Sequence, residues 1–248
     1  MGKSMHWRDL LIGHMAFYHK EPRALYYDHF MKIKNWEKWA DSVPLDEVKK
    51  LFDFIVRWDF HFQGDPQKFA EIYSKVSPII QNLKSARLED LDFNNDHVSD
   101  GIKRVFDSIC DCSWKYESTD TSKILHTIVP DLFVMWDRNI RERILGDVEC
   151  KWGAVYANDF LPKMQKEIND CISSFMSEKQ LDRAESAGRI RGLCDNKSFP
   201  KLIDEYNYMV CTKPKEFLAF IQDLKTKGKI TATEYERIAE KLQKIRNR

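Results

Sequence analysis

A lysine and an aspartate near the middle of the chain have residue types and a spacing that can do chemistry. Lys123 lies in an apolar helical run that Pro130 ends, and Asp137 stands fourteen residues later, where a second helix begins. The positive end of a helix dipole favours an ionised carboxylate at that position. A lysine that has lost its proton can attack a carbon atom as a nucleophile. The two residues therefore predict either a catalytic site or a structural contact between two helices.

Five residues that can bind nucleic acid accompany this pair: His126, Trp136, Arg138, Arg141 and Arg143. Arginine side chains commonly contact phosphates, and an aromatic ring can stack on an extruded base. The structural alternatives also stand. Asp137 has the residue type of a helix N-cap, Trp136 can be a core residue, and three arginines on one helix can form a solvated face.

The motifs around both residues resemble those of the helix-hairpin-helix DNA glycosylases. In that family a lysine opens the second helix of a DNA-binding hairpin, and an aspartate begins a later helix in a phrase such as V-D-x-x-V-x-R. The sequence matches the first motif at residues 123–126 and the second at 136–143. The resemblance covers about thirty residues. It implies packed helices around a cleft for a flipped base, with Asp137 stabilising the sugar cation and Lys123 forming a Schiff base.

The composition predicts an all-α fold. The chain has 248 residues, of which 43% are hydrophobic and 12% aromatic, with only nine glycines and eight prolines. Apolar residues recur at helical spacing over 23–40, 46–62, 66–83 and 98–109, and a long helix is predicted to begin at Asn158 or Asp159. The polar stretches 85–96 and 177–198 are interpreted as links. These elements predict a multi-helix orthogonal bundle.

Several residues have the types that begin or end helices. Asp65 with Pro66, Asp137, and Thr231 or Thr233 are predicted to begin helices, and Gly146 to end one. Cofactor and metal sites are not predicted, because nucleotide-binding fingerprints and clustered metal-ligand motifs do not occur in the sequence. The six cysteines lack metal-site spacing and are interpreted as free thiols in a cytoplasmic protein. No apolar run is long enough to predict a membrane span.

The chain is divided into a helical body of residues 1–210 and a C-terminal helical hairpin of residues 211–248. Within the hairpin, Gly228 separates two apolar faces, formed by Phe217, Leu218, Ile221 and Leu224 and by Tyr235, Ile238, Leu242 and Ile245. This segment resembles short helical hairpins at the C-termini of prokaryotic proteins, which implies self-association or contact with a protein partner. A hairpin packed on its own domain is the structural alternative.

Two functions remain open at this stage. The first is a DNA-binding protein related to the glycosylases, in which Asp137 and Lys123 cleave the N-glycosidic bond of a damaged base. The second is a non-catalytic module that binds a protein partner or a second copy through residues 211–248. The charge is nearly balanced, with 40 basic and 39 acidic residues. This is not typical of an obligate nucleic-acid binder, but a local basic face is compatible with it.

Overall fold

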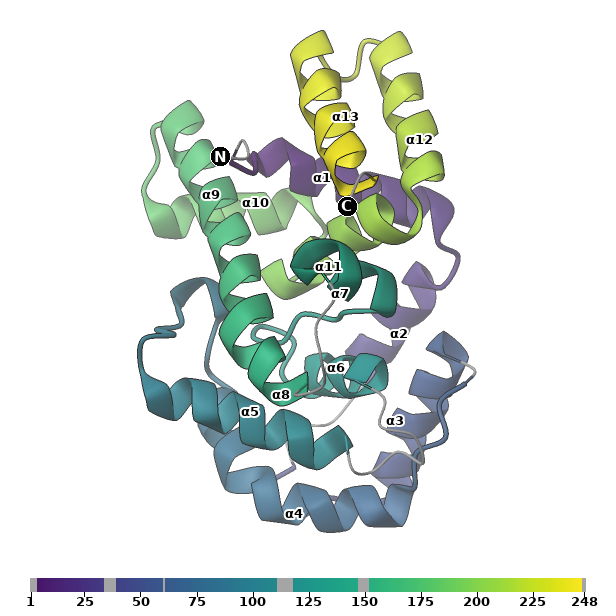
Figure 1. The fold of residues 1–248 in the computed structure, drawn as a ribbon, viewed down its shortest axis with the longest axis vertical. Coiled ribbons are helices and arrows are strands. Elements are labelled where there is room, and N and C mark those ends of the chain that lie inside the picture. Colours follow the sequence, from purple (N-terminus) through teal and green to yellow (C-terminus); the bar gives the residue numbers. More distant parts are fainter. Residues whose placement is uncertain (1–3, 34–38, 60, 111–117, 147–151, 247–248) are drawn as a thin grey trace.

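Helices and the turns between them make up the part of the chain that the structure describes. The computed structural model describes residues 4–33, 39–59, 61–110, 118–146 and 152–246. Within these ranges there is no β-strand, so the predicted all-α class is confirmed (Figure 1). None of the helices in these ranges is both long enough and apolar enough to cross a membrane.

The helices follow one another in chain order with short connections. They are α1 (Trp7–Lys20), α2 (Ala24–Ile33), α3 (Leu45–Trp58), α4 (Pro66–Leu83), α5 (Asp96–Cys110), α6 (Ser118–Ile128), α7 (Arg138–Leu145), α8 (Trp152–Val155), α9 (Leu161–Lys179), α10 (Arg183–Leu193), α11 (Phe199–Asn207), α12 (Pro214–Thr226) and α13 (Ala232–Arg246). One 3-10 turn, η2 (Leu88–Asp90), and two π-helical segments, η3 (Tyr156–Phe160) and η4 (Tyr208–Thr212), complete the order.

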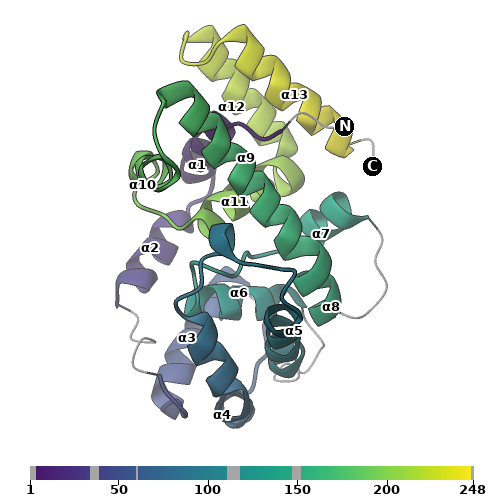
Figure 2. The ribbon, with the colours of Figure 1, turned by 90° about the vertical axis from the view of Figure 1, so that its left-hand side faces the viewer.

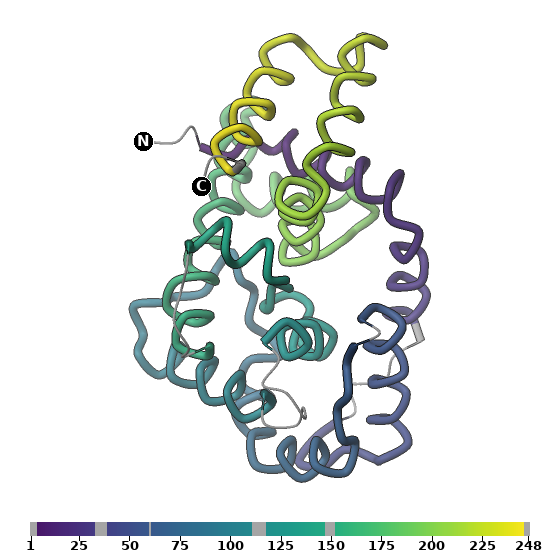
Figure 3. Tube along the Cα trace, turned by 45° about the vertical axis from the view of Figure 1, so that its right-hand side comes forward, coloured from purple at the N-terminus to yellow at the C-terminus, as the bar shows by residue number. Residues whose placement is uncertain are grey.

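The molecule is elongated, and its two ends come from different parts of the chain. Helices α3 and α4 lie toward one end, and α12 and α13 form the other (Figure 1). The long helix α9 runs between these ends (Figure 2). On one side, α1 and α2 lead from the C-terminal hairpin toward α3 (Figure 3). Helix α11 lies in the middle and packs most extensively against α1.

Polar residues begin three helices, and a glycine ends one, at the positions that the sequence predicts. Asp65 accepts hydrogen bonds from two backbone N–H groups at the start of α4, and Pro66 occupies the first turn. Asp137 is the N-cap of α7, and Gly146 ends that helix with a φ of 85°. This left-handed value favours glycine because it has no Cβ. Thr231, of the two candidates, forms the capping box of α13.

Other boundaries differ from the prediction. The helix expected to begin at Asn158 or Asp159 is already helical from Trp152, and η3 joins α8 to α9. A π-helical turn inserts an extra residue, so a single 3.6-residue period does not detect the continuity. The stretch 177–198 is not only a link, because it contains α10, which Asp182 caps. In the first predicted helix, residues 34–38 lie outside the described residues, and Leu25 is 71% exposed instead of buried.

The residue before Asp137 is a centre of the apolar core. Trp136 is fully buried. Its ring lies 4.9 Å from the ring of Tyr156, 5.0 Å from Phe160 and 5.8 Å from Phe106, measured between centroids. Its indole N–H donates to the backbone carbonyl of Ser118 at 3.0 Å. A buried indole whose N–H group has a hydrogen-bond partner is typical of a core residue. The position of Trp136 therefore agrees with its interpretation as a core residue.

The C-terminal hairpin packs against the helical body. Five of the apolar side chains predicted for its inner faces are buried: Phe217, Ile221, Leu224, Ile238 and Leu242. Leu218 is predicted to lie on the same apolar face, but its side chain is exposed. Among the described hairpin residues, it is the one large apolar side chain in the exposed class. Arg237 of α13 pairs with Asp9 of α1 at 2.6 Å. The segment η4 continues the chain from α11 toward α12 across the predicted boundary after residue 210.

We expect Trp136→Ala to lower the free energy of unfolding by about 3–5 kcal/mol, because the truncation leaves a large cavity among aromatic rings. The exposed control, Leu25→Ala, is expected to change it by no more than about 0.5 kcal/mol. Urea unfolding followed by circular dichroism measures both. Equal losses in the two variants would contradict the core position of Trp136.

Candidate functional site

Lys123 and Asp137 line one cavity, although they belong to different helices. The cavity has a volume of about 290 Å³ and lies where α1, α6, α11 and η4 meet the start of α7. Phe17 and Trp58 form part of its apolar wall. The other polar residues that line it are Glu21, Arg23, Asp59, Thr119, Asp204, Tyr208 and Thr212. Ligand cavities usually have volumes of about 300–1,000 Å³, so this space suits a small ligand.

Asp137 is held by one donor from its own helix and one from η4. The backbone N–H of Ile140 donates to Oδ1 at 2.7 Å, and the hydroxyl of Thr212 donates to Oδ2 at 2.8 Å. The predicted N-cap role is therefore confirmed. Each carboxylate oxygen has a further lone pair beyond these bonds. Capping and a role in chemistry are thus compatible for this residue, because the cap uses only part of its acceptor capacity.

Lys123 approaches the cavity from α6 between two carboxylates. Its Nζ lies 2.8 Å from Oδ2 of Asp59 and 3.6 Å from Oδ1 of Asp120. Burial raises the pKa of Asp59, but the charge and hydrogen bond of Lys123 outweigh this, and the pKa is lowered. The lysine side chain is only 11% exposed. The carboxylates of Asp59 and Asp120 stabilise the ammonium group of Lys123 at the cavity.

Asp204 is a second carboxylate of the cavity, and it comes from the buried helix α11. Its Oδ2 accepts a hydrogen bond from Nζ of Lys201 at 3.0 Å. Burial raises the pKa of Asp204 to about 6, although the Lys201 ammonium lowers it, and the charges of Glu205 and Asp137 raise it further. Asp204 can therefore hold a proton near neutral pH, whereas Asp137 sits at a helix N-terminus that favours the carboxylate.

An ionised carboxylate and its donors form the opposite rim. Glu21 accepts hydrogen bonds from the guanidinium of Arg23 at 2.7 and 2.9 Å and from the hydroxyl of Tyr208 at 2.9 Å. Burial raises the pKa of Glu21, but these hydrogen bonds lower it more strongly, to about 2. Burial and the hydrogen bond to Glu21 raise the pKa of Tyr208, so its hydroxyl stays protonated.

Of the other residues predicted for the site, Trp136 lines the same cavity as Lys123 and Asp137, and the rest are dispersed. His126 is fully buried; its Nδ1 donates to the carbonyl of Phe133 at 2.6 Å, and Nε2 accepts from the hydroxyl of Tyr27 at 2.7 Å. With Trp136 also buried, neither ring is exposed for stacking on a base. Full burial places both rings in the protein interior, which is the structural alternative for Trp136.

The side chains of the three arginines of α7 lie in different environments. Arg138 is 80% exposed and pairs with Glu142 at 2.6 Å. The guanidinium of Arg141 lies 4.3 Å from the ring centroid of Trp152 and donates to the Ser118 hydroxyl at 2.8 Å. Arg143 lines a different cavity. Of the five predicted nucleic-acid contacts, Arg138 is therefore the one that is both exposed and next to Asp137.

The sequence analysis missed Asp204, Tyr208 and Thr212. All three follow Ser198, which caps α11, but nothing in the spacing of Lys201 and Asp204 distinguishes them from an ordinary solvated ion pair. Lys201 and Asp204 are buried because α11 is enclosed on all sides, and this enclosure depends on the tertiary structure. Tyr208 and Thr212 reach the cavity through the π-helical turn of η4. Such turns are frequent at functional sites.

Groups of three or more histidine, cysteine or acidic side chains that could hold a metal do not occur among the described residues. Four of the cysteines, Cys110, Cys171, Cys194 and Cys211, are buried, and residues 112 and 150 lie outside the described ranges. Comparisons with models of protein families, with curated proteins and with solved structures found no match to this chain. Functional inference therefore starts from the cavity itself.

We expect Glu21→Gln to destabilise the protein at pH 7 by roughly 1–3 kcal/mol, because hydrogen bonds to a charged group are lost. The lowered pKa of Glu21 means that its contribution is complete above about 4.5 and is lost as the pH falls toward 2. The difference between the variant and the original protein should therefore shrink over this range in urea unfolding. Glu185→Gln, at an exposed ion pair, is the control, and a pH-independent difference for Glu21→Gln would contradict the assignment.

Proposed function

We propose that the protein binds DNA and hydrolyses the N-glycosidic bond of a damaged base, as the helix-hairpin-helix glycosylases do. The observation that carries this proposal is that Lys123 and Asp137, the two residues of the family resemblance, line one cavity of about 290 Å³. A flipped base is held in such enzymes between apolar side chains and polar groups that read its edge. Phe17 and Trp58 supply the apolar wall of this cavity, and its carboxylates supply the polar groups.

Asp137 and Asp204 have the two environments that hydrolysis of an N-glycoside needs. As the bond between C1′ and the base nitrogen breaks, positive charge develops on the sugar, and the Asp137 carboxylate stabilises it. Asp204, with its pKa raised to about 6, donates a proton to the leaving base. Water adds to C1′ and releases its proton to Asp137. Two carboxyl groups, one acting as the acid and the other as the base or stabilising charge, recur in glycoside hydrolysis.

Lys123 has an electrostatic role in this proposal. A lysine forms a Schiff base only as a neutral amine, whereas here Nζ contacts the carboxylates of Asp59 and Asp120. We therefore propose simple hydrolysis without strand cleavage by a lyase step. The ammonium group is placed to bind the DNA phosphate or the base on the side of the cavity opposite Asp137.

The surface contact with DNA is proposed to include Arg138. Its side chain is exposed at the first turn of α7, one residue after Asp137. Because the whole chain is nearly neutral, DNA binding would rest on a few such contacts, and each phosphate contact would add about −0.9 to the slope of log K against log salt concentration. The alternative function, partner binding through the C-terminal hairpin, lacks the exposed apolar stripe that it requires, since the inner faces of the hairpin are buried.

We expect Asp137→Asn to reduce release of a damaged base by roughly 100-fold or more, because it removes the charge that stabilises the transition state. Asparagine is also a good N-cap, so α7 should remain folded. The measurement uses duplexes carrying uracil, 8-oxoguanine or alkylated bases, with free base and abasic sites quantified. Borohydride trapping in the same reactions tests for a Schiff base on Lys123, with Lys123→Gln beside it.

The matched control is Asp182→Asn, which makes the same change at the N-cap of α10, away from the cavity. It should leave base release unchanged. Absence of base release from every duplex, together with absence of salt-dependent DNA binding, would overturn the proposal. A trapped adduct that is lost in Lys123→Gln would keep the glycosylase function and replace hydrolysis by the lyase mechanism.

The proton on Asp204 predicts a pH dependence. Because the pKa of Asp204 is raised to about 6, the protonated fraction falls as the pH rises through that value, and the rate of base release should fall with it. Asp204→Asn should remove this limb of the profile and lower the maximal rate by about 10²–10⁴-fold. Circular dichroism checks that the variant is folded. An unchanged alkaline limb in folded Asp204→Asn would exclude this residue as the acid.

A further inference from the structure

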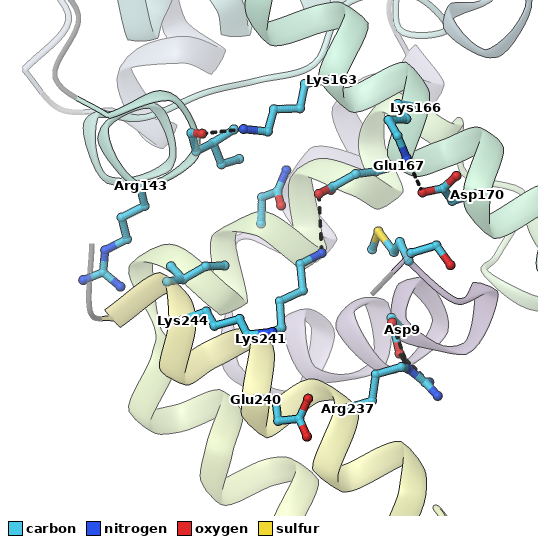
Figure 4. Close-up of a pocket in the computed structure, with 15 residues that line it drawn as sticks. Asp9, Arg143, Lys163, Lys166, Glu167, Asp170, Arg237, Glu240, Lys241 and Lys244 are labelled. Carbon is cyan, nitrogen blue, oxygen red and sulfur yellow. Dashed lines mark hydrogen bonds and ion pairs between the residues drawn. The ribbon is translucent and has the colours of Figure 1, made fainter. Parts of the chain in front are cut away.

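A second cavity lies at the other end of α7, between α7, α9 and α13. Its volume is about 300 Å³, and it also borders the residues that precede α1. Figure 4 shows Arg143 descending from α7 at one end of this cavity and Lys241 of α13 meeting Glu167 of α9 near its centre. The cavity is separate from the one around Asp137, and the proposed glycosylase chemistry does not use it.

Positive charge is in excess around this second cavity. Six basic and four acidic side chains line it, which is a formal excess of two positive charges. Three of the acidic residues are already matched by basic ones: Asp9 by Arg237 at 2.6 Å, Asp170 by Lys166 at 2.8 Å and Glu167 by Lys241 at 3.5 Å. The side chains that remain are three basic ones, Arg143, Lys163 and Lys244, and one acidic one, Glu240, so the excess of two positive charges stays among them.

Two buried polar atoms of the cavity residues have no hydrogen-bond partner. They are Nη1 of Arg143 and Oε2 of Glu167. Buried polar groups in folded proteins are almost always satisfied, and two such atoms beside one cavity are compatible with a ligand that hydrogen-bonds to them. Nη1 can only donate, and an ionised carboxylate oxygen can only accept. A ligand that satisfies both atoms must therefore carry an acceptor and a donor.

The remaining basic groups favour an anion. Lys244 is an exposed side chain of α13 at this cavity, and Lys163 donates to the backbone carbonyl of Ile144 at 2.6 Å. Burial lowers the pKa of Lys241, but its interactions with Tyr206 and Glu167 outweigh this and raise it. Lys241 therefore stays charged and keeps Glu167 in place, with one oxygen directed to the lysine and the other unsatisfied.

We propose that this cavity binds a small phosphate monoester that also carries a hydroxyl group, of the size of a sugar phosphate. A dianionic phosphoryl group matches the excess of two positive charges, and the planar fork of Arg143 suits its oxygens. Lys244 supplies the second cation. The hydroxyl group donates to Oε2 of Glu167. A carboxylate ligand would leave one of the two positive charges unbalanced.

The test is calorimetric titration of the full chain with ribose 5-phosphate, inorganic phosphate and ribose. Ribose 5-phosphate should bind most tightly, inorganic phosphate more weakly, and ribose not measurably. Arg143→Gln and Lys244→Gln should each weaken binding of ribose 5-phosphate by about 10- to 100-fold, because each removes charge-assisted hydrogen bonds. Glu167→Gln should weaken binding of ribose 5-phosphate more than binding of inorganic phosphate, since only ribose 5-phosphate has sugar hydroxyl groups at a distance from its phosphoryl group.

The control variant is Lys227→Gln, which removes a lysine that pairs with Asp223 on the surface outside the cavity. Lys244 is exposed, so its variant tests the proposal even where Arg143→Gln is unstable in thermal unfolding. A 5′-phosphorylated oligonucleotide is titrated in parallel; tighter binding of its terminal phosphate than of ribose 5-phosphate would identify a DNA end as the source of the monoester. Absence of binding by both ribose 5-phosphate and inorganic phosphate would overturn the proposal. Equal affinity of Lys244→Gln and Lys227→Gln for ribose 5-phosphate would also overturn it.

Discussion

The buried ammonium group of Lys201 is the constraint on which the centre of the structure depends. Lys201 is 1% exposed, and its helix, α11, is enclosed on every side. A charge so far from water is tolerated only when it is paired. Asp204 and Glu205 provide that pairing, and Glu205 also binds Nδ1 of His14 on α1 at 2.7 Å. The charge cluster thereby fixes α1 against α11, where Gly13 permits the close approach because a Cβ there would lie 2.9 Å from the facing backbone.

The same cluster explains why the pKa of one carboxyl group of the candidate site is raised to about 6. Asp204 faces Lys201 on one side and the cavity on the other. Burial raises its pKa, and a single lysine shared with Glu205 does not fully offset that effect. Asp137 has the opposite environment, with donors from α7 and from Thr212. The functional asymmetry of the two carboxylates therefore follows from where each helix is buried and not from their residue type.

The sequence predicts those features that depend on neighbouring residues. The helical class, the caps at Asp65, Asp137 and Thr231, and the terminating Gly146 were accessible because each follows from local spacing or backbone chemistry. Features that depend on distant segments were not accessible. The burial of α11 and the π-helical turn that brings Thr212 to Asp137 both require the tertiary arrangement. The rings of Trp136 and His126 were assigned to nucleic acid because residue type does not distinguish a core aromatic from a stacking one.

Helix α7 has eight residues and is too short to be stable in isolation, so its position must come from its partners. Thr212 of η4 holds its start through Asp137, and Lys163 of α9 holds its end through the carbonyl of Ile144. Each of these contacts lies beside one of the two cavities. Two ligands that each distinguish the same two positions of α7 would be coupled through this helix, and by thermodynamic linkage the effect would be equal in both directions. The short helix is thus the element through which the two candidate sites would influence each other.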